Sequence, residues 1–282
     1  MKKQFIILII TLISTLMGFS QKTKKSAEIG LFFGGSYYIG DLNPVAHFNQ
    51  FTKPAGGVVF RYNLGTRLAL RASALFGNIE GHDSFSNSVA DVQRNLSFKS
   101  SIRELSGQLE FNFLDYEIGN ENRKFSPYIF LGLAVFKFSP ESISDSGDGV
   151  SLQPLGTEGQ GLNGGASSKK YKLTQLSIPF GIGIKTNLAK NIGLSLEWGM
   201  RKTYTDYLDD VSTTYYDPIK LEAARGVTAA ILSDPSIGTD PNYSNVGRQR
   251  GNSLTKDWYA FAGAILSFKL QPKRKPCPSA NN

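Results

Sequence analysis

The sequence predicts an all-β protein, an eight-stranded antiparallel barrel of the outer-membrane type with short periplasmic turns and long extracellular loops. Three observations support this prediction: segments in which apolar and polar residues alternate, connections that sort by length, and an unusual composition. Glycine (29 residues), phenylalanine (19) and tyrosine (12) are abundant, although only 40% of the chain is hydrophobic. This balance is expected where only every second residue of a strand faces lipid.

The alternation is clearest between Asn191 and Arg201, where every second residue is apolar. A period of two over this length indicates a strand with two different faces. Three other segments alternate in the same way, and four more are strand-like, each long enough to cross a membrane at a tilt. The eight predicted strands are 28–39, 56–63, 67–77, 101–113, 125–138, 171–185, 191–201 and 258–270.

The connections between these strands alternate strictly between short and long. Outer-membrane barrels have short periplasmic turns and long external loops, whereas a soluble sandwich has no reason to sort its loops in this way. We therefore expect both chain ends in the periplasm and four loops outside. The short connections are 64–65, 116–124 and 188–191, and the long ones are 40–55, 78–95, 139–170 and 205–257.

The two ends of the chain differ from the predicted barrel, which covers 21–270. Residues 1–20 combine Lys2 and Lys3 with an apolar run and small residues, which is typical of a secretory signal peptide cleaved before Gln21. An uncleaved membrane anchor is less favoured, because the apolar run is short and contains Thr and Ser. Residues 271–282 form a basic tail that we expect in the periplasm.

The interior of such a barrel is predicted to be filled. Eight strands enclose a space just wide enough for their own side chains. The charges on the inward faces have both signs, and an unpaired one would cost several kcal/mol, so we expect ion pairs and no porin activity. The predicted interior charges are Arg61, Arg71, Glu110, Glu197 and Arg201; the outward aromatics suited to interfacial girdles are Tyr62, Trp198, Trp258 and Phe268.

The single cysteine, Cys277, lies in the tail and cannot form an internal disulfide. In an oxidising compartment an odd cysteine can pair with another chain, although an unpaired thiol on a frayed tail is the simpler interpretation. The formal net charge of +8 is modest, and we expect no nucleic-acid partner for an exported protein. Outer-membrane lipid is the expected surrounding.

No catalytic residue, cofactor or metal is predicted. The two histidines, His47 and His82, lie in loops and cannot supply the three or four ligands of a zinc site. No nucleophile elbow is present, and a barrel enzyme acting on lipid through one of these histidines remains an alternative. Calcium also stays open, because loop oxygens bind it readily and Asp206, Asp209, Asp210 and Asp217 are close in sequence.

The stretch "YTDYLDDVSTTYYD" places two consecutive carboxylates, Asp209 and Asp210, at the root of the longest loop. Consecutive residues of an extended chain point to opposite sides, which is unsuitable for a two-carboxylate acid/base pair. In a closed barrel the last strand pairs with the first, so this loop and the loop after Ile39 are neighbours. We predict a hydrogen-bonded cluster of Asp41, Asn43, Asp209 and Asp210 at the rim.

Three phrases carry a resemblance to a known family: "GLFFGGSYYIGDLNP" (30–44), "YTDYLDDVSTTYYD" (204–217) and "RGNSLTKDWYAFAGAILSFKL" (250–270). The sequence resembles the PorG family, the outer-membrane barrel component of the type IX secretion system. The resemblance implies a non-enzymatic barrel that anchors or organises the protein secretion and gliding machinery. It also implies contact with a periplasmic ring of a PorK-like lipoprotein and a PorN-like protein. The alternative is a small transport or adhesion barrel whose loops bind an external ligand.

Overall fold

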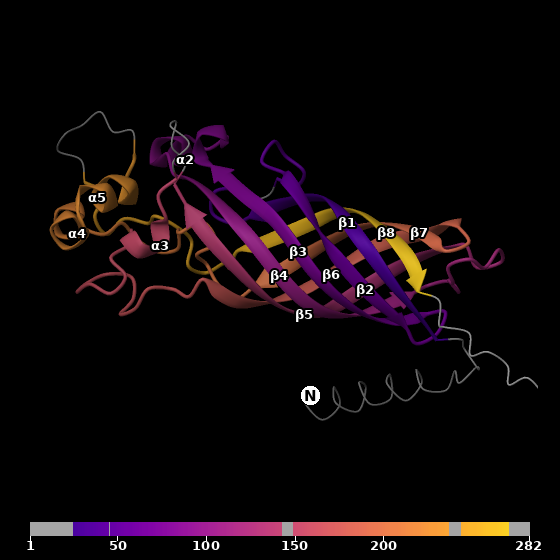
Figure 1. Cartoon of the computed structure of the whole chain (residues 1–282). Coiled ribbons are helices and arrows are strands. Elements are labelled where there is room, and N and C mark those ends of the chain that lie inside the picture. Colours follow the sequence, from indigo (N-terminus) through magenta and orange to yellow (C-terminus); the bar gives the residue numbers. More distant parts are fainter. Residues whose placement is uncertain (1–24, 45, 143–148, 237–243, 271–282) are drawn as a thin grey trace, which may run out of the picture.

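The computed structural model describes residues 25–44, 46–142, 149–236 and 244–270. The predicted signal peptide, the basic tail and Cys277 lie outside the described residues. Within the described part, one closed sheet accounts for most of the regular structure (Figure 1).

Eight antiparallel strands close into a barrel in sequence order, which confirms the predicted fold class. The first and last strands pair over their full lengths, from Ala27 with Leu270 to Ile39 with Trp258. Every strand therefore has two neighbours, and no sheet edge is left open. The strands are β1 (Ser26–Ile39), β2 (Lys53–Asn63), β3 (Leu68–His82), β4 (Ser97–Asn112), β5 (Phe125–Glu141), β6 (Thr174–Ala189), β7 (Ile192–Thr203) and β8 (Trp258–Leu270).

The helices all lie in the long loops at one end of the barrel, and the short turns lie at the other end (Figure 1). No helix in the described part of the chain is long and apolar enough to cross a membrane. The helical segments are the 3-10 turn η1 (Asp83–Phe85), α2 (Val89–Arg94), α3 (Leu152–Leu155), α4 (Pro218–Arg225) and α5 (Val227–Ser233).

The barrel has two zones that differ in which face of the sheet is apolar. In the zone next to the short turns, the outward residues are apolar and exposed, and the inward residues are polar and buried. In the zone next to the long loops this arrangement is inverted. The inverted zone has the inward core residues Ile79, Phe98, Phe136 and Phe138, and the outward polar residues Glu80, Lys99, Arg103 and Lys137.

The inversion explains where strand boundaries differ from the prediction. β3 continues to His82, β4 begins at Ser97 and β5 continues to Glu141, beyond the predicted ends at residues 77, 101 and 138. The ladder is regular throughout these extensions, since His82 pairs with Ser97 and Lys99 with Glu141. The prediction followed the pattern of apolar residues outside and polar residues inside, and this pattern ends where the zones meet.

The loop 40–52 covers part of the outer wall at β1, β7 and β8. Tyr37 points outward yet is fully buried, because the rings of His47, Phe48 and Trp198 surround it. The Trp198 Nε1 donates to the Tyr37 hydroxyl at 2.6 Å, and His47 Nδ1 lies 3.0 Å from the same oxygen. Trp258 is also half-buried on the outward side, whereas Tyr62 and Phe268 are outward and exposed near the short turns.

Candidate functional site

The barrel interior holds a buried network of ion pairs. Arg61 bonds Glu28 through Nη1 at 2.9 Å and Glu110 through Nε at 3.0 Å, and Lys185 also pairs with Glu110. All four side chains are at most 2% exposed. Two cations thus share two carboxylates in the zone where the outer wall is apolar.

Two further pairs extend this network along the barrel. Arg71 binds Glu197 with two nitrogens, at 2.6 and 2.8 Å, and Tyr128 donates to the same carboxylate at 2.8 Å. Arg201 pairs with Glu104 at 3.0 Å, close to the core of the inverted zone. The structure therefore places all five predicted interior charges inside the barrel, in ion pairs: Arg61, Arg71, Glu110, Glu197 and Arg201.

Three partners in this network were not predicted: Glu28, Glu104 and Lys185. The signal was present in the period of two, because Glu104 shares the parity of Glu110 and Lys185 shares the polar face of its strand. The predicted set of three arginines and two glutamates also leaves a net buried positive charge, which indicates at least one further buried carboxylate.

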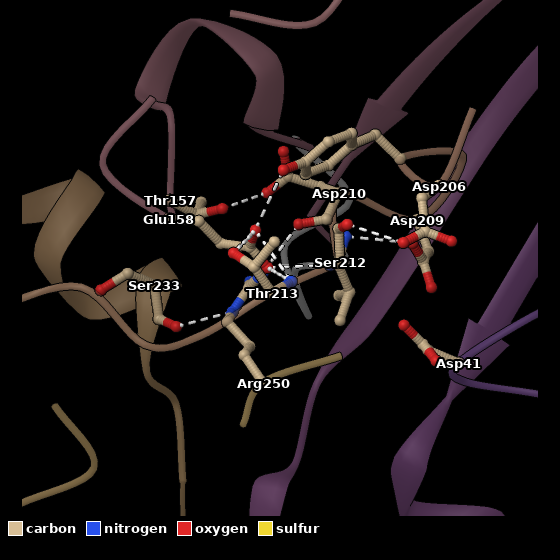
Figure 2. A network of polar contacts seen from close by, with 12 residues as sticks. Asp41, Thr157, Glu158, Asp206, Asp209, Asp210, Ser212, Thr213, Ser233 and Arg250 are labelled. Atoms are coloured by element: carbon tan, nitrogen blue, oxygen red, sulfur yellow. Dashed lines mark hydrogen bonds and ion pairs between the residues drawn. The ribbon is translucent and has the colours of Figure 1, made fainter. Parts of the chain in front are cut away.

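A cap formed by the described residues 149–173, 204–236 and 244–257 lies at the mouth of the barrel (Figure 1). At its centre Glu158 receives bonds from the backbone of Ser212 and Thr213, from the Thr213 hydroxyl and from Arg250 at 3.2 Å (Figure 2). Arg250 also donates to the backbone carbonyls of Asp210 and Ser233. This buried pair joins segments 92 residues apart.

Asp210 connects the same two loops a second time. Its carboxylate accepts from the Thr157 hydroxyl at 2.5 Å and from the Tyr171 hydroxyl at 2.6 Å. The Tyr171 ring stacks on Tyr207 at 4.6 Å, which packs the polar bridge against an aromatic pair. Asp210 has a φ of +66°, a left-handed conformation that Asp tolerates better than most residues. This turn lets its carboxylate bind partners different from those of Asp209.

Asp209 and Asp257 share one hydroxyl group, that of Tyr38. Tyr38 donates to Asp209 in a short bond and lies 3.2 Å from Asp257 Oδ1. The other oxygen of Asp209 accepts from the Val211 amide, and that of Asp257 accepts from the Leu208 amide. All three side chains are at most 2% exposed, so this contact fixes the long loop to the first strand.

Four aspartates of the cap, Asp206, Asp209, Asp210 and Asp257, are held away from water, and burial raises their pKa values. The pKa rises to about 6 for Asp206 and to about 6 for Asp210. For Asp209 burial is the largest cause and the nearby Asp41 adds repulsion, so its pKa lies well above the ordinary range. The pKa of Asp257 is raised in the same direction by burial and by Asp209. Burial thus favours the protonated form of both carboxyl groups.

The four residues of the predicted rim cluster lie in loops at the same end of the barrel, and each has its own hydrogen-bond partners. Asp41 accepts from the Asn252 amide at 3.0 Å, and Arg94 donates to the Asp41 carbonyl. Asn43 donates to the carbonyls of Tyr38 and Ala46 and so shapes the loop after β1. Each of the four predicted residues thus bonds to the loops, but no described hydrogen bond joins one of them directly to another.

The described hydrogen bonds of the two histidines and of Asp217 join them to residues close in sequence. His47 contacts Tyr37, and His82 contacts Glu80 at 2.8 Å, so their described hydrogen bonds involve no serine. Asp217 begins α4 by accepting from the Ile219 amide. Within the described ranges, no group of three or more His, Cys, Asp or Glu side chains is placed to hold a metal ion.

One protein-family model covers most of this chain. The model described as a domain of unknown function (DUF6089) matches residues 3–222. The chain belongs to the DUF6089 family. No curated protein matches this DUF6089 chain.

Several solved barrels are similar to the DUF6089 chain at low identity. The N-terminal barrel domain of Pseudomonas aeruginosa OprF is 14% identical, covering 88% of this chain and 100% of that one, with a TM-score of 0.35. Ail, the attachment invasion locus protein of Yersinia pestis, is 13% identical, covering 87% and 99%, with a TM-score of 0.37. OprG of P. aeruginosa is 9% identical, covering 87% and 98%, with a TM-score of 0.38.

Proposed function

We propose that the chain is an outer-membrane barrel whose long loops lie outside the cell and whose short turns and chain ends lie in the periplasm. The apolar outer zone supports this proposal: Leu105, Leu131 and Leu133 are 68%, 59% and 72% exposed on the outer wall. Such a band would be costly in water and is the surface that lipid covers. The polar outer face of the inverted zone fits the part of β3, β4 and β5 that would rise above the bilayer.

Within that setting we propose a non-enzymatic role: the barrel anchors or organises the type IX secretion machinery and binds its PorK-like and PorN-like ring proteins. The observation that carries the proposal concerns the three phrases that resemble the PorG family. Tyr38 lies in the first phrase, Asp209 in the second and Asp257 in the third, and all three meet at one buried hydroxyl. The resemblance thus falls on the residues that fix the cap to the barrel.

This placement supports the opposite end of the barrel as the surface that we propose for the partner. If the PorG-like phrases hold the external cap, the periplasmic ring is left with the opposite end of the barrel. That end presents the exposed apolar residues Leu114 and Leu188 beside the ion pairs Arg67–Asp115 and Lys269–Glu117. An apolar centre with a charged rim is the usual composition of a protein interface.

The filled interior supports a scaffold more than a transport role. The ion pairs occupy the barrel at several levels, and the cap lies over one mouth. A path for solutes would need these buried pairs to separate, which costs several kcal/mol for each uncompensated charge. A purified barrel in planar bilayers is expected to show no steady conductance.

The test is affinity purification through a tag inserted at Ser168–Lys169, an exposed stretch of a long loop. Extraction in a gentle detergent after chemical crosslinking is expected to recover the ring proteins with the barrel, and deletion of the gene is expected to block cargo secretion. A matched tag on an unrelated small barrel controls for carry-over. Recovery of the barrel alone, together with normal secretion in the deletion strain, would overturn the proposal.

A further inference from the structure

A pocket of about 560 Å³ lies between the loops 40–52 and 83–96, beside the cap. It borders the buried carboxylate network at Asp41, but Glu158, Asp209, Asp210 and Asp257 do not line it. The lining combines aromatic rings with amide and hydroxyl groups. Phe51, His82 and Phe85 form one wall, and Gln50, Asn87 and Ser86 contribute polar groups.

The aromatic wall is preorganised. Phe51 and His82 stack at 5.0 Å, and the Phe85 ring meets both edge-on, at 5.3 and 5.8 Å. The His82 ring is also held by Glu80. Phe85 is nevertheless 61% exposed, so one ring that is fixed by its neighbours keeps a free surface.

Some polar side chains of the lining already have hydrogen-bond partners within the protein, and others do not. The Asp83 carboxylate is fully occupied by Arg94, at 2.7 Å to each oxygen, and by the Leu96 amide. The side-chain amides of Gln50 and Asn87 have no partner among the described residues and are exposed. Each can donate and accept, which suits a ligand with several hydroxyl groups.

The charge of the lining selects against anions. Asp41, Asp83 and Asp91 line the pocket, and no lysine or arginine does. One cation, Arg94, faces these carboxylates: it bonds Asp83 and lies 4.0 Å from Asp91, whereas the Asp41 carboxylate accepts from the Asn252 amide. A neutral ligand that has an apolar face for an aromatic ring, and hydroxyls for the amides and the acidic oxygens, uses these groups together.

We infer that this pocket binds a neutral pyranose sugar, with its C–H face against Phe85 and its hydroxyls toward Gln50 and Asn87. Pockets of this volume hold small ligands, and a few placed polar groups fix their orientation. The sugar could belong to a free glycan or to a lipopolysaccharide of the surrounding leaflet. The inference does not rest on the secretion role.

The full-length protein in lipopolysaccharide-free nanodiscs is tested by saturation-transfer NMR and titration calorimetry. The probes are the methyl glycosides of glucose, mannose and galactose, and N-acetylglucosamine, with glucuronate and spermidine as charged comparators. Saturable binding of at least one neutral sugar is expected, with glucuronate at least threefold weaker than glucose. Loss of the signal when lipopolysaccharide is added identifies the leaflet's own sugars as the occupant, and retention identifies free glycans.

Two variants locate the binding. Phe85→Ala is expected to weaken binding at least tenfold, and Asn87→Ala, which removes an exposed amide without a partner, at least threefold. Val89→Ala is the control, because Val89 is 73% exposed in the same loop and does not line the pocket. The inference is overturned if no neutral sugar binds, if spermidine binds more tightly than every sugar, or if the two pocket variants bind like the control.

Discussion

At the scale of single residues, the Tyr38 hydroxyl bonds both ends of the loop between β7 and β8 to the first strand. One donor proton serves two buried carboxylates, Asp209 and Asp257, and no described cation bonds either of them. Two negative charges that bond the same hydroxyl group repel strongly in a buried site, so protonation of at least one carboxyl group stabilises the arrangement.

The pH dependence of the cap follows from the raised pKa values. A carboxyl group whose pKa is higher in the folded state stabilises the fold below its unfolded pKa, near 4, and loses that contribution as the pH rises through the folded value. For Asp206 and Asp210 the loss is centred between about 4 and about 6, and Asp209 contributes in the same direction. Hydrogen exchange of the loop 204–236, corrected for the intrinsic rate, is expected to show more opening at pH 8 than at pH 5.

Asp209→Asn is expected to remove a large part of this pH dependence, because the amide is neutral at every pH and can still accept from Tyr38. Glu222→Gln, at an exposed position of α4, should keep the behaviour of the unmodified protein. Equal exchange at both pH values in the unmodified protein would show that the carboxylates do not control the cap.

A second residue-level prediction concerns the buried pair Arg71–Glu197. Arg71→Ala leaves Glu197 buried with only Tyr128 as a donor, and the expected loss of unfolding free energy is about 3–5 kcal/mol. The double variant Arg71→Met, Glu197→Gln removes both charges and should lose clearly less. Arg67→Ala breaks the exposed pair with Asp115 and is expected to cost less than about 1 kcal/mol. Guanidinium unfolding of the detergent-refolded barrel measures all three, and an Arg71→Ala variant as stable as Arg67→Ala would contradict the prediction.

At the scale of elements, the cap is a unit held by contacts that are distant in sequence. Glu158 and Arg250 are 92 residues apart, and Thr157 and Asp210 are 53 apart. Such contacts leave no periodic trace, so the sequence could not predict them. The neighbourhood of the loops after β1 and β7 was predictable, because it follows from barrel closure alone.

The strands show the same contrast. The period of two identified four strands clearly, since it is a direct consequence of two different faces, and the other four were recognised as strand-like segments with a less regular pattern. It failed at the ends of β3, β4 and β5, where the apolar face changes sides and the strand extensions carry residues such as Glu80 and Lys99 outward. Where the outer wall is apolar the inward residues are polar, and where the outer wall is polar the inward residues are apolar. A search for one of these two alternating patterns misses the other.

Removing the central arginine of the cap tests whether the cap and the barrel are separate units. Arg250→Ala leaves Glu158 buried without its cation and removes the bonds to Asp210 and Ser233. We expect limited proteolysis to cut the loop 204–257 at least several times faster, while the barrel keeps its resistance to unfolding in detergent. Lys169→Ala, at an exposed position of the other long loop, should leave cleavage unchanged. A barrel that unfolds together with the cap would show that the two are one cooperative unit.

At the scale of the whole molecule, the two zones divide the barrel between two surroundings. The ion pairs lie inside the zone with the apolar outer wall, and the aromatic core lies inside the zone with the polar outer wall. In one zone the outer wall is apolar, as lipid requires, and polar side chains fill the interior. In the other zone the outer wall is polar, as water requires, and apolar side chains fill the interior. This division predicts a definite depth and direction of the barrel in a membrane.

Cysteine labelling tests that depth and direction in a single background, Cys277→Ser. Leu254→Cys, 92% exposed in the longest loop, is expected to react with a membrane-impermeant maleimide in intact cells. Leu188→Cys, 57% exposed beside a short turn, should react only after the outer membrane is permeabilised. Leu133→Cys is 72% exposed on the bare outer wall, yet lipid should shield it until detergent is added. In the isolated chain Leu133 is more exposed than Leu188. Faster labelling of Leu188→Cys than of Leu133→Cys, after the outer membrane is permeabilised, is therefore the result expected from a surrounding bilayer. Labelling of Leu133→Cys in intact cells would place the apolar zone in water, and labelling of Leu188→Cys but not Leu254→Cys would invert the proposed orientation.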